Sequence, residues 1–271
     1  MSTQLLDSLN PVQQQAVRHI DGPLLILAGA GSGKTRLLTH RVAYLLQQGI
    51  PGSRILAVTF TNKAAQVMKD RIRRLVGPHA FDCWVGTFHA ICARILRRDG
   101  AAIGLDSNFV VFDDGDQVAL TKECLAELDI SDEEYKPRVI LGAISRAKEQ
   151  LLDPDAYRRT ESGAFEEVVG RVYRLYQEKL AANRALDFDD LIALTVRLLR
   201  QDAAARDYYQ EKFQHVLVDE YQDINFAQYE LIRALTGKHR NICVVGDDDQ
   251  SVYSFRGCDV RFILAFEKDY P

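Results

Sequence analysis

Short apolar runs alternate with amphipathic segments over the first 112 residues of the chain. Each run is too short for a core helix and therefore predicts a buried strand. The predicted strands are 24–27, 55–60, 84–87 and 109–112. Between them apolar residues recur at helical spacing. The predicted helices are 12–20, 36–46, 63–76 and 88–98. This alternation is typical of a parallel sheet with helices on both faces.

The pattern changes between residues 113 and 186, where helical periodicity dominates and predicts no strand. The expected helices there are 117–128, 137–149 and 165–182. Strands return after residue 187. The predicted elements are a helix at 191–200, a strand at 215–218, a helix at 226–235 and a strand at 241–245. We therefore expect an α/β domain made of residues 1–112 and 187–271, with residues 113–186 inserted as an all-helical subdomain.

The first predicted strand runs into a glycine-rich loop, and a predicted helix follows it. The loop reads Ala28-Gly-Ala-Gly-Ser-Gly-Lys-Thr35 and matches the phosphate-binding pattern except for alanine at its first position. Its glycines let successive backbone N–H groups converge on anionic oxygens. Lys34 is expected to reach the β- and γ-phosphates, and the Thr35 hydroxyl to ligate Mg²⁺. The residues expected to cradle phosphates are Ala30, Gly31, Ser32, Gly33, Lys34 and Thr35.

Two further strands end in polar residues. Strand 215–218 is followed by Asp219 and Glu220. Asp219 is placed to hold Mg²⁺, and Glu220 to polarise an attacking water as general base. An acidic strand end is also typical of a helix cap, so this interpretation depends on the phosphate loop. Strand 241–245 leads to Gln250, at the sheet edge where it would sense the γ-phosphate.

The overall composition limits the partners and the cellular location that the protein can have. The net charge of −4 and pI near 5.9 provide no global basic field, so any nucleic-acid surface must be local. Five cysteines without C-x-x-C spacing indicate reduced, buried thiols rather than disulfides or zinc ligands. The N-terminus lacks a basic leader, and no apolar run reaches membrane-span length. We expect a cytoplasmic protein without a membrane partner.

Seven stretches, in one order, resemble the N-terminal part of superfamily 1 DNA helicases of the UvrD/PcrA/Rep type. They are residues 9–17, 27–35, 59–65, 86–89, 186–191, 218–223 and 245–257. The resemblance implies a RecA-like parallel sheet of the P-loop NTPase class. It also implies an ATP- and Mg²⁺-dependent 3′–5′ helicase and single-stranded DNA translocase. Such an enzyme would act in repair or replication in a bacterial-type, nucleoid-associated setting.

The same resemblance implies roles for individual residues. Gln13 would recognise the adenine edge and Arg36 would lie against the base, while Gln250 would couple the γ-phosphate to the DNA groove. The catalytic set is then Lys34, Asp219, Glu220 and Gln250.

On the DNA side, three aromatic residues would stack on bases of the single strand: Phe60, Tyr253 and Phe255. Stacking contributes about 1–3 kcal/mol per base whatever the sequence. Phe255 stands where the family often has tryptophan. Four polar residues would contact phosphates or support those contacts: Thr61, Asn62, His89 and Arg256. A strand-end phenylalanine such as Phe60 is, without the motif, more typical of a core position.

Two functional hypotheses follow. The first is a motor acting on single-stranded DNA and on junctions between single- and double-stranded DNA. The second is a P-loop kinase or metabolic ATPase with a small-molecule acceptor. The aromatic residues favour the motor, and the intact Lys34, Asp219 and Glu220 oppose a non-catalytic relic. The resemblance implies a second RecA-like domain later in the same polypeptide that supplies arginines to the γ-phosphate. Residues 1–271 alone are therefore expected to be nearly inactive. The sequence specifies no protein partner.

Overall fold

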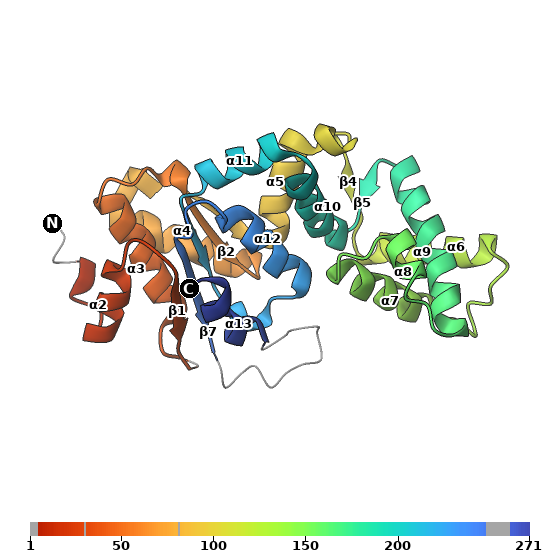
Figure 1. Ribbon diagram of the computed structural model, residues 1–271, viewed down its shortest axis with the longest axis horizontal. Coiled ribbons are helices and arrows are strands. Elements are labelled where there is room, and N and C mark those ends of the chain that lie inside the picture. The colour runs from red at the N-terminus through yellow and green to blue at the C-terminus, as the bar shows by residue number, and fades with distance from the viewer. Residues whose placement is uncertain (1–4, 30, 81, 248–260) are drawn as a thin grey trace. The chain divides into compact units, whose positions relative to one another are not determined.

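The computed structural model describes residues 5–29, 31–80, 82–247 and 261–271, and the side chains of these residues except those of His79 and Arg261. The chain divides into two compact units (Figure 1). The first, here called the sheet unit, comprises Met1–Ile91, Ala203–Ile224 and Tyr229–Pro271. The second, the helical unit, comprises Cys92–Asp202 and Asn225–Gln228.

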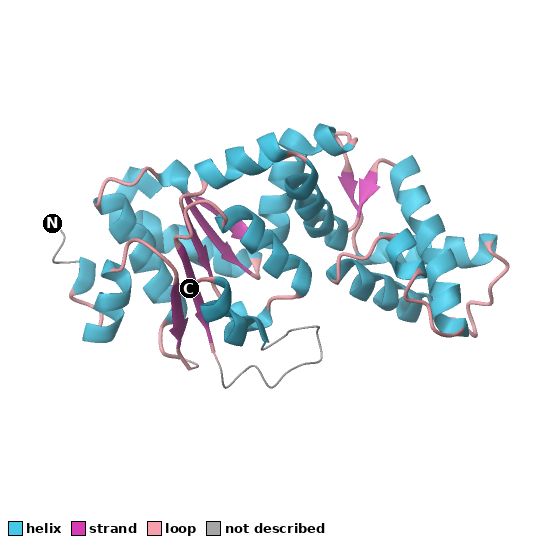
Figure 2. Cartoon of the chain, in the orientation of Figure 1, coloured by secondary structure: helices cyan, strands magenta, loops and turns pink. Residues whose placement is uncertain are grey.

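The sheet unit contains a five-stranded sheet in which every pairing is parallel. Its strand order is β1-β7-β6-β2-β3. Figure 2 shows these strands in magenta. Their bounds are β1 (Leu24–Leu27), β2 (Ile55–Thr59), β3 (Trp84–Thr87), β6 (His215–Val218) and β7 (Ile242–Gly246). The predicted α/β class with a parallel sheet is confirmed.

Helices surround this sheet. They are α2 (Pro11–Arg18), α3 (Lys34–Gln47), α4 (Asn62–Val76), α11 (Ala203–Lys212), α13 (Arg261–Asp269), the start of α5 (Phe88–Asp99) and most of α12 (Phe226–Thr236). Three 3₁₀ turns accompany them: η1 (Gly52–Arg54), η2 (Gly77–Ala80) and η4 (Tyr221–Asp223). Leu38 of α3 and Met68 of α4 pack with Ala57 and Leu217 of the sheet in one apolar core. Of the helices within the described ranges, none is both long and apolar enough to traverse a bilayer.

Strand register brings distant segments to one edge. Leu27 at the end of β1 pairs with Gly246 of β7, and the Ala28 N–H donates to the Gly246 carbonyl at 3.0 Å. The Asp219 N–H donates to the Val58 carbonyl of β2, also at 3.0 Å. Because all strands are parallel, their carboxyl ends share this edge. The fold therefore gathers the loops after β1, β6, β7 and β2.

The helical unit has its own apolar core, which includes Leu125, Ile144 and Tyr176. Its elements are the rest of α5, η3 (Gly100–Ile103), α6 (Asp114–Glu127), α7 (Pro137–Glu149), α8 (Pro154–Arg158), α9 (Ala164–Ala182), α10 (Phe188–Gln201), β4 (Val110–Val111) and β5 (Ala185–Leu186). The unit extends beyond the expected 113–186, because α10 packs on α7 and η3.

One predicted strand has a different partner from the one expected. The run at 109–112 was expected to join the main sheet. Instead, β4 pairs in parallel with β5 to form a separate two-stranded sheet in the helical unit. The apolar run correctly indicated extended backbone. It could not indicate the partner strand, which lies over 70 residues later in a stretch predicted to be wholly helical.

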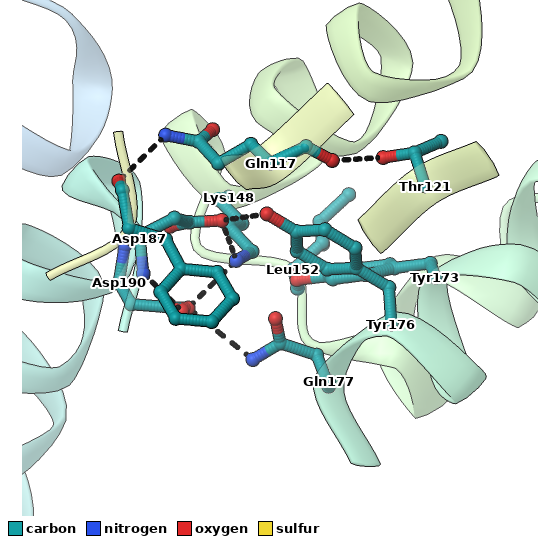
Figure 3. Close-up of polar contacts among 10 residues, drawn as sticks. Gln117, Thr121, Lys148, Leu152, Tyr173, Tyr176, Gln177, Asp187 and Asp190 are labelled. Atoms are coloured by element: carbon teal, nitrogen blue, oxygen red, sulfur yellow. Dashed lines mark hydrogen bonds and ion pairs between the residues drawn. The ribbon is translucent and has the colours of Figure 1, made fainter. Parts of the chain in front are cut away.

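Two aspartates of the 186–191 motif pair with a buried lysine in the helical unit (Figure 3). Lys148 Nζ lies 2.5 Å from an oxygen of Asp187 and 2.8 Å from one of Asp190. The Tyr176 hydroxyl donates to Asp187 at 3.1 Å. Burial lowers the pKa of Lys148, but the two carboxylates outweigh it and the net pKa is raised. The same two aspartates form the capping box of α10, so the lysine fixes where this helix begins.

Asp189, next to this cluster, predicts a pH-dependent stability. Burial, with the negative charge of Asp187, raises its pKa to about 7, above the value of about 4 in an unfolded chain. The protonated carboxyl therefore contributes stability that is present below about pH 4 and is lost as the pH rises through about 7. We expect Asp189→Asn to reduce the fall in unfolding free energy between about pH 5 and about pH 8, measured by urea denaturation.

The control is Glu178→Gln, which neutralises an exposed carboxylate of α9. It should retain the wild-type pH dependence. An Asp189→Asn protein whose stability falls with pH as steeply as that of the wild type would contradict this assignment.

Candidate nucleotide-binding site

The loop between β1 and α3 has the backbone of an anion cradle. Gly31 and Gly33 have φ of 75° and 89°, in the left-handed region that side chains other than glycine rarely adopt. Gly33 is the N-cap of α3, and no described side chain caps this helix. The first N–H groups of α3 are therefore available to an anion, which the helix dipole also favours.

Thr35 and Asp219 meet at this loop although they are 184 residues apart in sequence. The Thr35 hydroxyl donates to Asp219 Oδ2 at 3.0 Å. The other carboxylate oxygen of Asp219 accepts the Glu220 N–H at 3.1 Å. Burial raises the pKa of Asp219, and the hydrogen bond from Thr35 opposes that shift. A hydroxyl and a carboxylate in contact are oxygen donors of the kind Mg²⁺ prefers.

The donor set fits a shared magnesium ion rather than one enclosed by protein. Within the described part of the chain, no three His, Cys, Asp or Glu side chains cluster in a way that would hold a metal. Thr35 and Asp219 would supply two oxygens and leave the other positions to phosphate and water. Mg²⁺ commonly binds through one or two protein groups together with substrate phosphates.

Lys34 lies among the carboxylates of the same edge. Its Nζ is 2.9 Å from Asp247 Oδ2 and 3.8 Å from Glu220 Oε2. The Gln222 amide links the two acids: its nitrogen donates to Glu220 at 2.8 Å, and its oxygen accepts the Asp247 N–H at 3.0 Å. Asp247 and Gln222 were not predicted to belong to the site. Their positions just after β7 and inside the 218–223 motif were the available signals.

Glu220 has an unusual backbone for a residue with a long side chain, with φ of 53°. Such strain costs on the order of 1 kcal/mol and persists only where the surroundings fix it. Its side chain remains about one-third exposed while it accepts from Gln222. The conformation therefore holds a carboxylate toward Lys34 and leaves part of it accessible to water.

A pocket of about 590 Å³ opens beside the loop. Its lining residues are Gly31, Gly33, Lys34, Thr35, Arg36, Thr39, His40, Arg71, Arg74, Leu75 and Glu220. Burial lowers the pKa of His40, which favours a neutral imidazole at neutral pH. The two α4 arginines, Arg71 and Arg74, were not predicted to belong to this site. In the sequence they belong to a run of basic residues, a pattern that is equally typical of a solvated helix face.

The residues expected near the base lie beside the loop. The Gln13 side-chain nitrogen donates to the Ser32 carbonyl at 3.1 Å, and its oxygen accepts the Asn10 N–H at 3.2 Å. The Arg36 guanidinium donates to the Ser8 carbonyl at 2.8 Å. The structure thus brings both predicted base-contacting side chains to the mouth of the phosphate loop.

Four residues predicted to contact DNA are described. Phe60 follows β2 at the same sheet edge, and its ring meets that of Phe88 edge-on at 5.6 Å between centroids. The Thr61 hydroxyl accepts a backbone N–H of α4 as its N-cap, and Asn62 begins that helix with an exposed side chain. His89 is partly buried on α5, and burial lowers its pKa. Five predicted residues lie outside the described ranges and their roles stay predictions: Ala30, Gln250, Tyr253, Phe255 and Arg256.

These features define a class of protein. A parallel sheet carries a glycine-rich loop after one strand and an Asp-Glu pair after another, and the two meet through Thr35 and Asp219. This is the architecture of a RecA-like P-loop nucleotide-binding domain.

Comparison with known proteins agrees with this class. The family model of the UvrD/REP helicase N-terminal domain matches residues 9–271, and the chain belongs to that family. It is 51% identical over 272 residues to the ATP-dependent DNA helicase PcrA of Bacillus subtilis (strain 168). It is 49% identical over 268 residues to the protein of the same name from Staphylococcus aureus (strain Mu50). These alignments cover 100% and 98% of this chain but only 37% of each relative. The expected family is confirmed.

The pocket geometry predicts that Arg71 contributes to nucleotide affinity. We expect Arg71→Ala to weaken binding of a fluorescent ATP analogue by about threefold to tenfold, since an exposed charge-assisted contact is lost. The matched control is Lys63→Ala, which removes a cation of the same helix that does not line the pocket. Equal affinities of the Arg71→Ala protein and the wild type would exclude Arg71 from the site.

Proposed function

We propose that the chain is the ATP-binding part of an ATP-dependent DNA helicase that moves 3′ to 5′ along single-stranded DNA. Its substrates would be single strands and their junctions with duplex, met during repair or replication at the nucleoid in the cytoplasm. Family membership supports this proposal, as do the two relatives named ATP-dependent DNA helicases. Because the chain spans about 37% of those relatives, the activity is proposed for the full-length protein.

The observation that carries the proposal is the contact between Thr35 and Asp219 at 3.0 Å. It joins the phosphate loop to the Asp-Glu pair at one edge of one sheet. ATP hydrolysis needs that juxtaposition, since the phosphate-binding groups and the water-activating carboxylate must act on the same γ-phosphate.

The chain's own groups fit the steps of hydrolysis. Lys34, now paired with Asp247 at 2.9 Å, would exchange that carboxylate for the β- and γ-phosphate oxygens. Glu220, oriented by Gln222, would accept a proton from the attacking water. Thr35 and Asp219 would hold Mg²⁺, which would offset the negative charge on the phosphates. Gln13 and Arg36 would bind the base.

Coupling to DNA would use the same sheet edge. Phe60 follows β2, which pairs with β6, the strand that Asp219 follows. We propose that Phe60, Tyr253 and Phe255 stack on bases, and that Thr61, Asn62, His89 and Arg256 contact or support the phosphates. Gln250 would transmit the state of the γ-phosphate. A shift of this edge driven by the nucleotide would then also change the contacts with DNA.

A second RecA-like domain of the full-length polypeptide would complete the site. It would supply arginines to the γ-phosphate, a contribution on the order of 10³–10⁵ in rate in related phosphoryl-transfer enzymes. Residues 1–271 alone would bind ATP weakly and hydrolyse it very slowly.

The test compares three proteins: the full-length enzyme, its Lys34→Ala variant, and residues 1–271. We expect single-stranded DNA to stimulate ATP hydrolysis by the full-length enzyme. Lys34→Ala should abolish hydrolysis and unwinding while the circular dichroism spectrum stays unchanged, because the lysine acts on phosphates. Residues 1–271 should hydrolyse ATP at least about 10³-fold more slowly than the DNA-stimulated enzyme.

Equal hydrolysis by the full-length enzyme with and without DNA would contradict the motor and favour a P-loop kinase or metabolic ATPase. Full DNA-stimulated turnover by residues 1–271 would contradict the need for a second domain.

A further inference from the structure

A buried arginine ties helix α2 to the helix that follows the phosphate loop. Arg41 of α3 is 2% exposed. One guanidinium nitrogen donates to the Ala16 carbonyl at 2.8 Å and another to the Ile20 carbonyl at 3.3 Å. Helix α2 has only eight residues and would not be stable alone. Arg41 therefore satisfies a carbonyl at the end of α2 and places a positive charge where the helix dipole favours it.

The chain just before α2 is held by the same helix α3. Ser8 contributes its carbonyl to Arg36 at 2.8 Å, and its hydroxyl lies 3.3 Å from His40 Nε2. His40 Nδ1 donates to the Arg36 carbonyl at 2.8 Å, so in the neutral ring Nε2 accepts from Ser8. Three side chains of α3 thus fix α2 at both ends.

Gln13 lies between these two attachments. One N–H of its amide is used by the Ser32 carbonyl, and one lone pair of its oxygen by the Asn10 N–H. A primary amide carries two N–H groups and two acceptor sites. The two contacts therefore restrain the amide and leave one N–H and one acceptor site that neither of them uses. That pair matches adenine, which presents an adjacent acceptor and donor at N7 and N6, and does not match guanine.

Arg41 is a costly way to fill core volume. Its hydrogen bonds among the described residues go to main-chain carbonyls rather than to a carboxylate, and burial lowers its pKa. An apolar side chain of similar size would pack there without a buried charge. What the guanidinium adds is a rigid fork that joins the end of α2 to the segment before β1.

We propose that Arg41 is a positioning residue for base recognition: it holds α2 so that the Gln13 amide meets adenine while its backbone contacts are kept. The inference rests on the proposed function, because it requires an ATP site at the phosphate loop. It assigns base selectivity to a side chain that lines neither the pocket nor the loop.

The test measures dissociation constants of residues 1–271 for ATP, GTP and inorganic tripolyphosphate. We expect Arg41→Met to weaken ATP binding by about tenfold, the effect of one or two hydrogen bonds, and to leave tripolyphosphate unchanged. The preference for ATP over GTP should fall accordingly. In a Gln13→Ala background, Arg41→Met should not further change the dissociation constant for ATP or for GTP. The control Leu235→Ala, which removes a buried α12 side chain, should lower stability and keep the preference.

Each outcome supports or overturns the positioning role of Arg41. A wild type that binds no nucleotide overturns the proposed function and this inference with it. A wild type that prefers ATP, beside a folded Arg41→Met protein with the same preference, overturns this inference alone. An equal loss of tripolyphosphate binding also overturns it, since the phosphate loop would then be disturbed. If Arg41→Met does not fold, Arg41→Lys replaces it, because one ammonium lacks the fork. The preference should then fall at least about threefold, and an unchanged preference overturns the inference.

Discussion

The hydrogen bond between Thr35 and Asp219 is the contact on which the rest of the site depends. It exists because β6 and β7 are placed between β1 and β2, so that the loop after β1 faces the end of β6 across a single strand. An antiparallel arrangement would send these loops to opposite edges, and another order of parallel strands would move them apart along the same edge. The apolar core below the edge, with Leu38, Ala57 and Leu217, holds the strands in this register.

The opposite charges of Lys34 and the nearby carboxylates explain how these side chains are arranged at the phosphate loop. Lys34 lies near the carboxylates of Asp247 and Glu220, which supply anionic oxygens to its ammonium group. The positive φ of Gly31 and Gly33 shapes the backbone of the loop next to this lysine. Burial raises the pKa of Asp219, so the site holds its carboxylate in an environment that a cation would relieve. This arrangement supports the proposal that the site takes a polyanion that carries a metal.

Local sequence patterns predicted much of the fold and of the candidate site. The glycine loop and the Asp219-Glu220 pair were recognisable because each follows a short apolar strand, and parallel sheets place such ends together. Long-range features were not accessible: the run at 109–112 gave no indication that its partner is β5. Asp247 and Arg71 belong to the site only through packing between distant segments. The part of the DNA groove assigned to residues 250–256 stays a prediction from resemblance alone.

We expect one metal ion to be shared between the phosphate loop and the residue that follows β6. Crystals of residues 1–271 grown with a non-hydrolysable ATP analogue and Mn²⁺ would test it through anomalous scattering. We expect a single anomalous peak beside the β- and γ-phosphates, at bonding distance from Thr35 Oγ1 and within one water of Asp219. A peak bound elsewhere, or an analogue seated away from the loop, would contradict it.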